Sequence, residues 1–377
     1  MTQENKVFVN NKLMRCGYTT GTCATAASKA AAKMLFSRVP LTTVKITVPR
    51  GQTLTLEIEC ITIENESVTC AVRKDGGDDI DATHGTLIFS TVLLRDDGKI
   101  VIDGGKGVGR ITRKGLDQPV GNAAINHVPR NMIYEALESV GKENDHNLGF
   151  TAIIEVPEGE EIAKRTFNPN LGIIGGISIL GTSGIVEPMS EVALIETIRT
   201  EMKMHVAEGA QYLIVVPGNY GKDFLEEMDF IGKDSAIKCS NFVGEALDCA
   251  LELGVKGLLL VGNLGKLVKI AGGIMNTHSR NADARMEILA ANSILAGADI
   301  NSVKEILGCV TTDDALDVIN EAGLMKPTMD LIAEKIQNSM EHRTGGKMLV
   351  GTVVFSSKYG KLCESANVTD LRERLRQ

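Results

Sequence analysis

The 377-residue sequence contains no tryptophan, and aromatic residues make up only 4% of it. Proteins that bind single-stranded nucleic acid stack the bases on aromatic side chains, so this class is disfavoured. The charge balance agrees, because 40 Lys and Arg residues against 48 Asp and Glu residues give a formal net charge of −8. A general nucleic-acid binder is therefore not expected, whereas a local basic cleft for a small anion remains open.

The sequence also lacks a metal-binding cysteine pattern, a secretion signal and a membrane-spanning run. Its eight cysteines are dispersed, with no C-x-x-C pair and no Cys/His spacing typical of zinc. The N-terminus does not show the charged-then-apolar pattern of a signal peptide, and no apolar run reaches the roughly 18 residues that span a bilayer. We expect a cytoplasmic protein with free thiols and no metal of its own.

Hydrophobic patterning predicts two domains of different class, since the chain is longer than one core usually supports. Residues 1–190 show one alanine-rich helix and then successive strands, typical of an α+β domain. In residues 191–377 strands alternate with helices, which predicts a doubly wound, Rossmann-like α/β domain. The hairpin in residues 345–377 either belongs to this second domain or returns to the first.

The stretch Val255–Arg280 combines a strand pattern, a glycine turn, basic residues and a histidine. The apolar run Gly257–Val261 predicts a strand covered on both faces, and the glycine turn would place backbone N–H groups at its carboxyl end, where open α/β sheets bind ligands. A second such turn is expected at Pro217–Gly221, so the two turns would form the lips of one nucleotide pocket. The candidate cofactor-binding residues at these turns are Gly218, Asn219, Gly262, Asn263 and Gly265.

Basic residues gather in two segments. Between Asn263 and Arg280 there are three cations and no acid, and between Gly104 and Arg130 five cations face one acid. Arginine holds carboxylates bidentately and lysine acts as a point charge, so both segments suit a small anion. A plain solvated loop is the alternative for the second. The candidate anion-binding residues are Lys106, Arg110, Arg113, Lys114, Arg130, Lys266, Lys269 and Arg280.

Residues 73–85 hold four aspartates and one histidine within a short loop. Such a loop is ordinarily only solvated, but this much charge around one imidazole can also build a site for proton transfer or for a cation. The candidates are Asp75, Asp78, Asp79 and His84. His278 is a further candidate, because it precedes a helix expected from about Ala282, and a positive helix end with Lys266 and Arg280 nearby would keep its imidazole neutral.

Two further segments have both a structural and a ligand-binding interpretation. Thr19, Thr20 and Thr22 precede a helix predicted from about Cys23 to Phe36, and hydroxyls at a helix N-terminus favour a negative group or act simply as caps. Five glycines lie between residues 172 and 184, so that either backbone crosses backbone closely there or a ligand lies against it.

Six segments together resemble one family over essentially the full chain, the cobalt-precorrin-5B (C1)-methyltransferases of anaerobic cobalamin synthesis. The segments occur in the family's order and are GYTTGTCATAASKAA (17–31), KDGGDDIDATHG (74–85), GGKGVGRITRKGL (104–116), AINHVPR (124–130), TFNPNLGIIGGISILGTSGIVEPMS (166–190) and LLLVGNLGKLVKIAGGIMNTHSRNADARMEILA (258–290).

This resemblance implies S-adenosylmethionine-dependent C1-methylation of cobalt-precorrin-5B to cobalt-precorrin-6A, with cobalt only as part of the corrinoid substrate. A sulfonium methyl transfers directly to carbon, so positioning is the main demand. The basic residues would hold the acetate and propionate arms of the acceptor, with residues 1–190 on the corrinoid side of a cleft. The threonines and strand-end turns would contact the donor.

Two other classes stay open. A nucleotide-dependent oxidoreductase would use the same doubly wound half, but the chain has no Gly-x-Gly-x-x-Gly turn that opens a helix. A non-catalytic corrinoid-binding protein would need no donor pocket. In each case the expected partner is a small molecule, without nucleic acid or membrane, and a homo-oligomer is left open.

Overall fold

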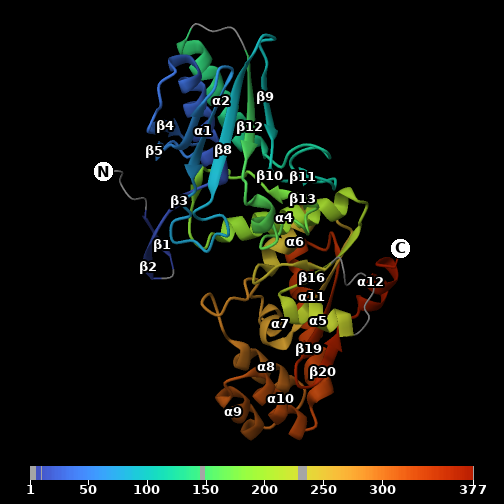
Figure 1. The fold of residues 1–377 in the computed structure, drawn as a ribbon. Coiled ribbons are helices and arrows are strands. Elements are labelled where there is room, and N and C mark those ends of the chain that lie inside the picture. Colours follow the sequence, from blue (N-terminus) through green and yellow to red (C-terminus); the bar gives the residue numbers. More distant parts are fainter. Residues whose placement is uncertain (1–5, 10, 145–148, 228–235, 377) are drawn as a thin grey trace. The chain divides into compact units, whose positions relative to one another are not determined.

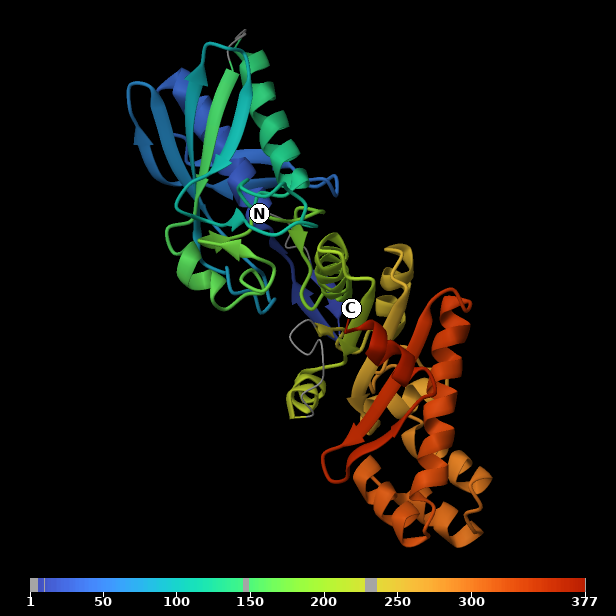
Figure 2. The same cartoon turned by 90° about the vertical axis from the view of Figure 1, so that its right-hand side faces the viewer.

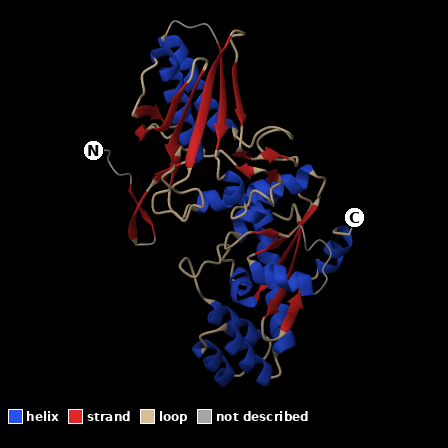
Figure 3. Cartoon of the chain, in the orientation of Figure 1, coloured by secondary structure: helices blue, strands red, loops and turns tan. Residues whose placement is uncertain are grey.

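The computed structural model describes residues 6–9, 11–144, 149–227 and 236–376, and the chain divides into two compact units, residues 1–190 and 191–377. Figures 1 and 2 give two views of the ribbon, and Figure 3 shows that each unit contains both helices and sheets. The protein is therefore of mixed α/β class, and each unit is described by itself. Among the described residues, no helix is both long and apolar enough to cross a membrane.

A five-stranded sheet is the centre of the first unit, with strand order β6-β7-β8-β12-β9. Neighbouring strands are antiparallel except β12 and β9, which are parallel. Helices α1 and α2 pack against each other and against this sheet. The bounds are β6 (Glu59–Ile63), β7 (Ser67–Arg73), β8 (Leu87–Arg95), β9 (Ile100–Gly104), β12 (Gly149–Glu155), α1 (Thr20–Ser37) and α2 (His127–Glu143).

Shorter elements surround this sheet. The hairpin of β4 and β5 packs beside α1, and the N-terminal hairpin of β1 and β2 leads into β3. These elements are β1 (Lys6–Val9), β2 (Lys12–Arg15), β3 (Gly17–Tyr18), β4 (Thr43–Thr47), β5 (Thr53–Glu57), β10 (Gly107–Val108), β11 (Arg110–Ile111), α3 (Gly159–Ala163), β13 (Ile173–Ile174), β14 (Gly176–Ile177) and β15 (Ile185–Val186). Residues 54–61 are divided between two strands, because β5 ends at Glu57 and β6 belongs to the larger sheet.

Helix α1 is almost entirely buried because it is built from small residues. Ala24, Ala27 and Ala31 are fully buried, and the Ser28 hydroxyl lies 2.9 Å from that of Ser90 on β8. Small side chains allow the close approach of helix and sheet that this contact requires. The helix begins at Thr20, before the expected start, because Thr19 supplies the N-cap oxygen.

The glycine-rich segment and the basic loop cross each other backbone against backbone. Strands β10 and β14 pair in parallel, and β11 pairs with β13. A Cβ atom at Gly107 would lie 1.8 Å from the Val156 carbonyl oxygen, and one at Gly176 would lie 2.1 Å from the Gly107 carbonyl oxygen. Of the two explanations expected for these glycines, the structure supports close backbone crossing.

The second unit contains a five-stranded sheet of order β17-β16-β18-β19-β20, in which the first four strands are parallel and β20 is antiparallel. The alternative in which residues 345–377 return to the first domain is wrong, because β19 pairs with β18 along its length. The strands are β16 (Tyr212–Val216), β17 (Ile237–Lys238), β18 (Gly257–Asn263), β19 (Leu349–Ser356) and β20 (Gly360–Glu364).

Helices cover both faces of this sheet. On β18, Leu259 packs in one core cluster with Phe224 of α5, whereas Leu258 packs in another with Leu267 of α7. Helices α5 and α7 therefore lie on opposite faces. The helices are α4 (Glu191–Ala207), α5 (Asn219–Glu227), α6 (Val243–Glu252), α7 (Leu264–Ala271), α8 (Arg285–Leu295), α9 (Ile300–Gly308), α10 (Thr312–Glu321), α11 (Met325–Thr344) and α12 (Val368–Arg374).

Two local expectations for this unit are corrected. The sequence predicted a glycine turn after the strand Gly257–Val261, whereas the structure has helix α7 directly after β18. The buried Leu264, Leu267 and Val268 have helical spacing, but the glycines around them made this pattern hard to recognise. The helix expected from Ala282 begins only at Arg285, so residues 272–284 form a loop.

We predict that Gly107→Ala destabilises the protein more than Gly121→Ala by about 1–3 kcal/mol, the range for forcing extra volume into a packed site. Both glycines have positive φ, 73° and 91°, but a Cβ atom at Gly121 meets nothing within 4 Å. The comparison thus separates backbone strain from steric contact, and chemical denaturation measures both variants. Equal losses would show that the crossing at Gly107 is not tight.

Candidate active site

In the first unit, the N-terminal end of α1 is covered by the glycine-rich segment. The Thr20 hydroxyl donates to the Leu180 carbonyl at 3.2 Å, and the Thr22 hydroxyl donates to the Gly184 carbonyl at 2.7 Å. The backbone N–H of Gly21 also donates to Leu180. Thr19, Thr20 and Thr22 are at most 5% exposed. The hydroxyls are therefore occupied within the chain, which corrects the expectation that they face a ligand.

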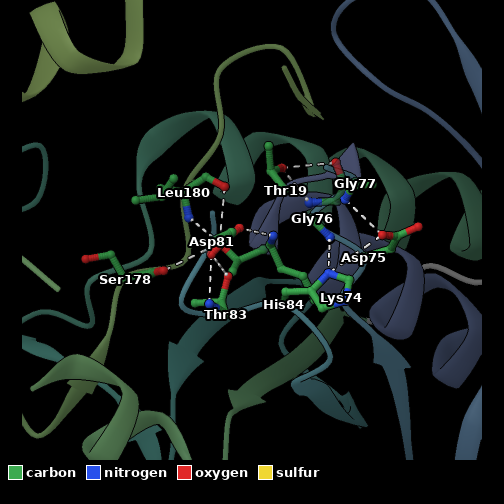
Figure 4. Close-up of polar contacts among 12 residues, drawn as sticks. Thr19, Lys74, Asp75, Gly76, Gly77, Asp81, Thr83, His84, Ser178 and Leu180 are labelled. Carbon is green, nitrogen blue, oxygen red and sulfur yellow. Dashed lines mark hydrogen bonds and ion pairs between the residues drawn. The ribbon is translucent and has the colours of Figure 1, made fainter. Parts of the chain in front are cut away.

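The acidic loop is closed by a buried ion pair between Lys74 and Asp81 (Figure 4). The Lys74 side chain is 2% exposed, and Asp81 also accepts hydrogen bonds from the backbone and hydroxyl of Thr83 at 2.8 and 2.6 Å. Burial acts to raise the pKa of Asp81, but the Lys74 charge and these hydrogen bonds outweigh it, so the pKa is lowered. This carboxylate is a structural anion that holds the base of the loop.

The three aspartates predicted for proton transfer also have fixed donors. Asp75 binds the Arg15 guanidinium through both oxygens, and these hydrogen bonds lower the pKa of Asp75. Asp78 accepts from the Arg15 backbone N–H at 2.6 Å, and Asp79 accepts from the Met189 backbone N–H at 2.9 Å. Asp75 is therefore neutralised by a cation, whereas no described residue forms an ion pair with Asp78 or Asp79.

His84 lies at the exposed end of this loop, with its side chain 54% exposed. Its Nδ1 accepts a hydrogen bond from the Gly76 backbone N–H at 3.0 Å. A neutral imidazole in this arrangement carries its proton on Nε2, because Nδ1 must supply a lone pair. The exposed nitrogen of His84 is thus a donor, which does not favour the predicted role of proton acceptor.

The basic loop separates into structural and exposed cations. Arg110 pairs with Asp103 through two hydrogen bonds of 2.7 and 3.1 Å. Arg130 donates to three backbone carbonyls, and burial lowers its pKa. Arg113 donates to the Asn170 carbonyl at 3.1 Å. These arginines hold the loop in place, which corrects their expected role as free anion ligands.

Lys106 and Lys114 differ from these arginines. Both side chains are exposed, and within the described ranges no acid pairs with either of them. A compact ammonium group on a flexible stem can follow the carboxylate arms of a ligand without first breaking an internal contact. Of the predicted cations in this loop, these two are the most available to an anion.

In the second unit, the carboxyl ends of β16 and β18 lie side by side. Because the helices that follow these strands cover opposite faces, the strand order reverses at this point, where open α/β sheets leave a crevice for ligands. The Lys266 ammonium lies at this edge of the sheet, 3.3 Å from the Pro217 carbonyl oxygen, and burial lowers its pKa. Asn263 caps α7 by accepting from Gly265 N at 2.9 Å.

The structure therefore brings the predicted cofactor-binding residues of the second unit to one edge of the sheet. A Cβ atom at Gly218 would meet open space, whereas Gly262 is closely packed against Pro217 and Leu267. Asn219 accepts a hydrogen bond from the Lys238 ammonium at 2.5 Å. The Gly218 backbone is accessible to a ligand, and the role of Gly262 is packing.

Lys269 does not have the exposed ammonium that the sequence suggested. Its side chain is buried, and Nζ donates to the carbonyls of Thr277 and Ala282 at 3.2 and 2.8 Å. Burial lowers the pKa of Lys269. His278 also departs from expectation, since α8 begins at Arg285 and the histidine lies in the loop that Lys269 holds, away from a helix N-terminus. The expected role of Lys269 as an anion ligand is therefore corrected: this residue supports the loop.

Sequence reasoning missed Arg15 and underestimated Lys74, the cations that hold the acidic loop. The signal for Lys74 was present, since it directly precedes the aspartates. Arg15 is distant in sequence, and only the fold brings it to Asp75. No metal centre was found in the part of the chain that the structure describes, where no three His, Cys, Asp or Glu side chains are grouped suitably.

Two parts of this mixed α/β chain match models of one protein family. Residues 7–188 match the family profile CbiD, and residues 276–366 match the profile CbiD, C-terminal domain. The chain belongs to the CbiD family.

Several relatives of this chain are cobalt-precorrin-5B C(1)-methyltransferases. That of Ruminiclostridium cellulolyticum is 47% identical over 94% of this chain and 92% of its own length. The enzyme of Alkaliphilus metalliredigens is 45% identical over 99% of this chain and 98% of its own length. A crystal structure of the cobalamin biosynthesis protein cbiD from Archaeoglobus fulgidus is 27% identical, covers 75% of this chain and 87% of that one, and has a TM-score of 0.40.

We predict that Asp81→Asn lowers the free energy of unfolding by about 3–5 kcal/mol at neutral pH, because it leaves the Lys74 ammonium buried without a counter-charge. The folded-state pKa of Asp81 lies below its ordinary value of about 4, so the pair stabilises the fold above that value and loses its contribution as the pH falls. The deficit of the variant should therefore shrink in acid, as measured by denaturation at several pH values.

Asp97→Asn is the matched control, since it removes the partner of Arg95 in a pair at the surface. Its effect should be much smaller, because exposed ion pairs contribute little. Similar losses for the two variants, or a deficit of Asp81→Asn that does not depend on pH, would contradict a buried ion pair as the base of the acidic loop.

Proposed function

We propose that this protein catalyses the S-adenosylmethionine-dependent C1-methylation of cobalt-precorrin-5B to cobalt-precorrin-6A in anaerobic cobalamin (vitamin B12) biosynthesis. The observation that carries the proposal is the similarity to cobalt-precorrin-5B C(1)-methyltransferases along nearly the whole chain, at 47% and 45% identity. Similarity of this extent includes both units, and so includes both candidate sites.

The donor would supply an electrophilic methyl group, and the protein's contribution is to align it with the acceptor. Alignment of two reactants can lower a barrier by several kcal/mol, about 7–11 at the extreme, without a protein nucleophile. The crevice at Pro217, Gly218 and Lys266 fits the donor, because it combines accessible backbone with an ammonium group for its carboxylate. We further propose that this unit is a doubly wound, Rossmann-like domain, which its strand order supports.

In the first unit, Lys106 and Lys114 would bind the carboxylate arms of the corrinoid, with the arginines of the same loop fixing its path. The acidic loop would supply proton acceptors. Among its carboxylates, Asp78 and Asp79 are the better candidates, because Asp75 and Asp81 are neutralised by Arg15 and Lys74. The corrinoid would then bind to the first unit, as expected from the sequence. We also propose a cytoplasmic location.

The proposal is tested by methyl transfer from S-adenosylmethionine carrying a radioactive methyl group to cobalt-precorrin-5B. Incorporation at C1, located by NMR of the product, is the expected result. Calorimetric titration with S-adenosylmethionine and with NADPH separates the alternatives. Binding of NADPH alone would identify an oxidoreductase, and binding of corrinoid without any donor would identify a carrier.

We predict that the double variant Lys106→Gln/Lys114→Gln binds the corrinoid about tenfold or more weakly than the wild type, with unchanged affinity for the donor. Each substitution removes an exposed charge that attracts a carboxylate, and the loss of about 1.4 kcal/mol corresponds to a factor of ten. The control is Lys45→Gln/Lys99→Gln, which removes two exposed lysines of the same unit outside this loop. Equal weakening in both double variants would indicate a general charge effect.

A further inference from the structure

We infer that residues 276–282 form a carboxylate-binding loop, in which His278 and Arg280 contact the ligand and Lys269 is a positioning residue. The inference rests on the proposed function for the identity of the ligands, but its physical basis is in the loop itself. The loop belongs to the second unit, and both of its contact residues expose their side chains.

The loop has one backbone conformation set by contacts along its length. Asn276 accepts from the His278 backbone N–H at 3.1 Å, and the His278 carbonyl accepts from Asn281 N at 3.0 Å. Thr277 N donates to the Asn241 carbonyl at 2.9 Å, and Asn276 bridges to Phe242. Residues 241 and 242 closely follow β17, so the loop is tied to the segment that leaves the carboxyl end of a parallel strand.

Lys269 supports this conformation from below. Its ammonium, on a side chain only 2% exposed, donates to the carbonyls of Thr277 and Ala282, which lie near the two ends of the loop. Among the described residues no carboxylate forms an ion pair with it. The charge of Asp283 acts on Lys269 without a direct ion pair. A buried charge without a direct ion pair costs free energy that an apolar residue would not. Lys269 therefore serves the conformation of the loop: it holds the two carbonyls at a fixed separation and so determines the shape of the loop between them.

The hydrogen bonds also set the tautomer of His278. The Arg280 backbone N–H donates to His278 Nδ1 at 3.1 Å, so the neutral ring carries its proton on the exposed Nε2. His127 shows the opposite arrangement, because its Nδ1 lies 2.5 Å from an Asp117 carboxylate oxygen and must carry a proton. The sequence suggested that His278 accepts a proton, whereas its geometry presents a hydrogen-bond donor.

The charge around the loop selects an anion. No described acid pairs with Arg280, and the nearby Asp283 is already bound to Arg285 by hydrogen bonds of 2.6 and 2.9 Å. An Nε2–H donor and a guanidinium two residues apart on one loop are groups that can bind one carboxylate. Under the proposed function, that carboxylate belongs either to an arm of the corrinoid or to the amino-acid part of the methyl donor.

The tautomer is tested by NMR of protein labelled with ¹⁵N-histidine, at a pH above the titration range of imidazole. His278 should show a non-protonated Nδ1 and a protonated Nε2, and His127 the reverse. In Lys269→Met, the His278 pattern should be lost while that of His127 persists, which separates loss of positioning from global unfolding. A protonated Nδ1 in wild-type His278, or an unchanged His278 pattern in Lys269→Met, would overturn the positioning role.

Binding titrations test the carboxylate. Four probes are used with the wild type, His278→Ala and Arg280→Gln: cobyrinic acid, its fully esterified form, S-adenosylmethionine and decarboxylated S-adenosylmethionine. We expect each variant to lose about tenfold in affinity for one acid and nothing for its carboxylate-free counterpart, as for the loss of one charge-assisted hydrogen bond. The acid affected identifies the source of the carboxylate. Lys304→Gln, an exposed substitution on α9, should leave all four affinities unchanged.

Two failures are distinguishable. If the wild type binds both S-adenosylmethionine and cobyrinic acid but neither variant changes any affinity, the carboxylate-binding loop is disproved and the proposed function stands. If the wild type transfers no methyl group to cobalt-precorrin-5B, the proposed function fails, while the NMR result still decides the role of Lys269.

Discussion

A buried ammonium group needs hydrogen-bond acceptors close by, and this requirement shapes both candidate sites. In the first unit Lys74 meets it with the Asp81 carboxylate, and in the second unit Lys269 meets it with two backbone carbonyls. In both places the acceptors belong to a loop with an exposed histidine. A buried ammonium that lacks acceptors is unfavourable. The loop is therefore most stable in the conformation that supplies these acceptors.

The same loops illustrate how hydrogen bonds choose between acid–base and binding roles. His84 and His278 each accept a backbone N–H at Nδ1, which leaves a donor at the exposed nitrogen. In each unit, an exposed donor of this kind suits the binding of an anionic group more than the acceptance of a proton. Under the proposed function, proton removal would be the role of Asp78 and Asp79, the carboxylates of the acidic loop for which no described residue supplies a cationic partner.

Much of the fold was predictable from the sequence because it depends on local periodicity. The strand at Gly257–Val261 was expected close to its observed bounds, and the alternation of strands with helices in residues 191–377 was expected as well. The predictions of helices and strands failed where an element is short or contains glycine, because the hydrophobic periodicity is then hard to recognise. Helix α7 is an example. The sequence indicated the segments of the candidate site. The ligand-binding roles expected for Thr20, Arg130 and Lys269 were not found, because their side chains bind carbonyl oxygens of the chain itself. A sequence shows that a side chain can bind an anion, and it does not show that a carbonyl elsewhere already occupies that side chain.

The sequence by itself determined the mixed α/β class, the segments that carry the chemistry and the resemblance to one family, since these follow from residue types and their order. Tertiary structure decided which charged groups are free. Arg15 reaches Asp75, and Ser28 meets Ser90, only because the sheet and α1 bring distant residues together. Burial and hydrogen-bond pairing are properties of neighbours in space, and they determine whether the same lysine is an anion ligand, as proposed for Lys106, or a support for a loop, as Lys269 is.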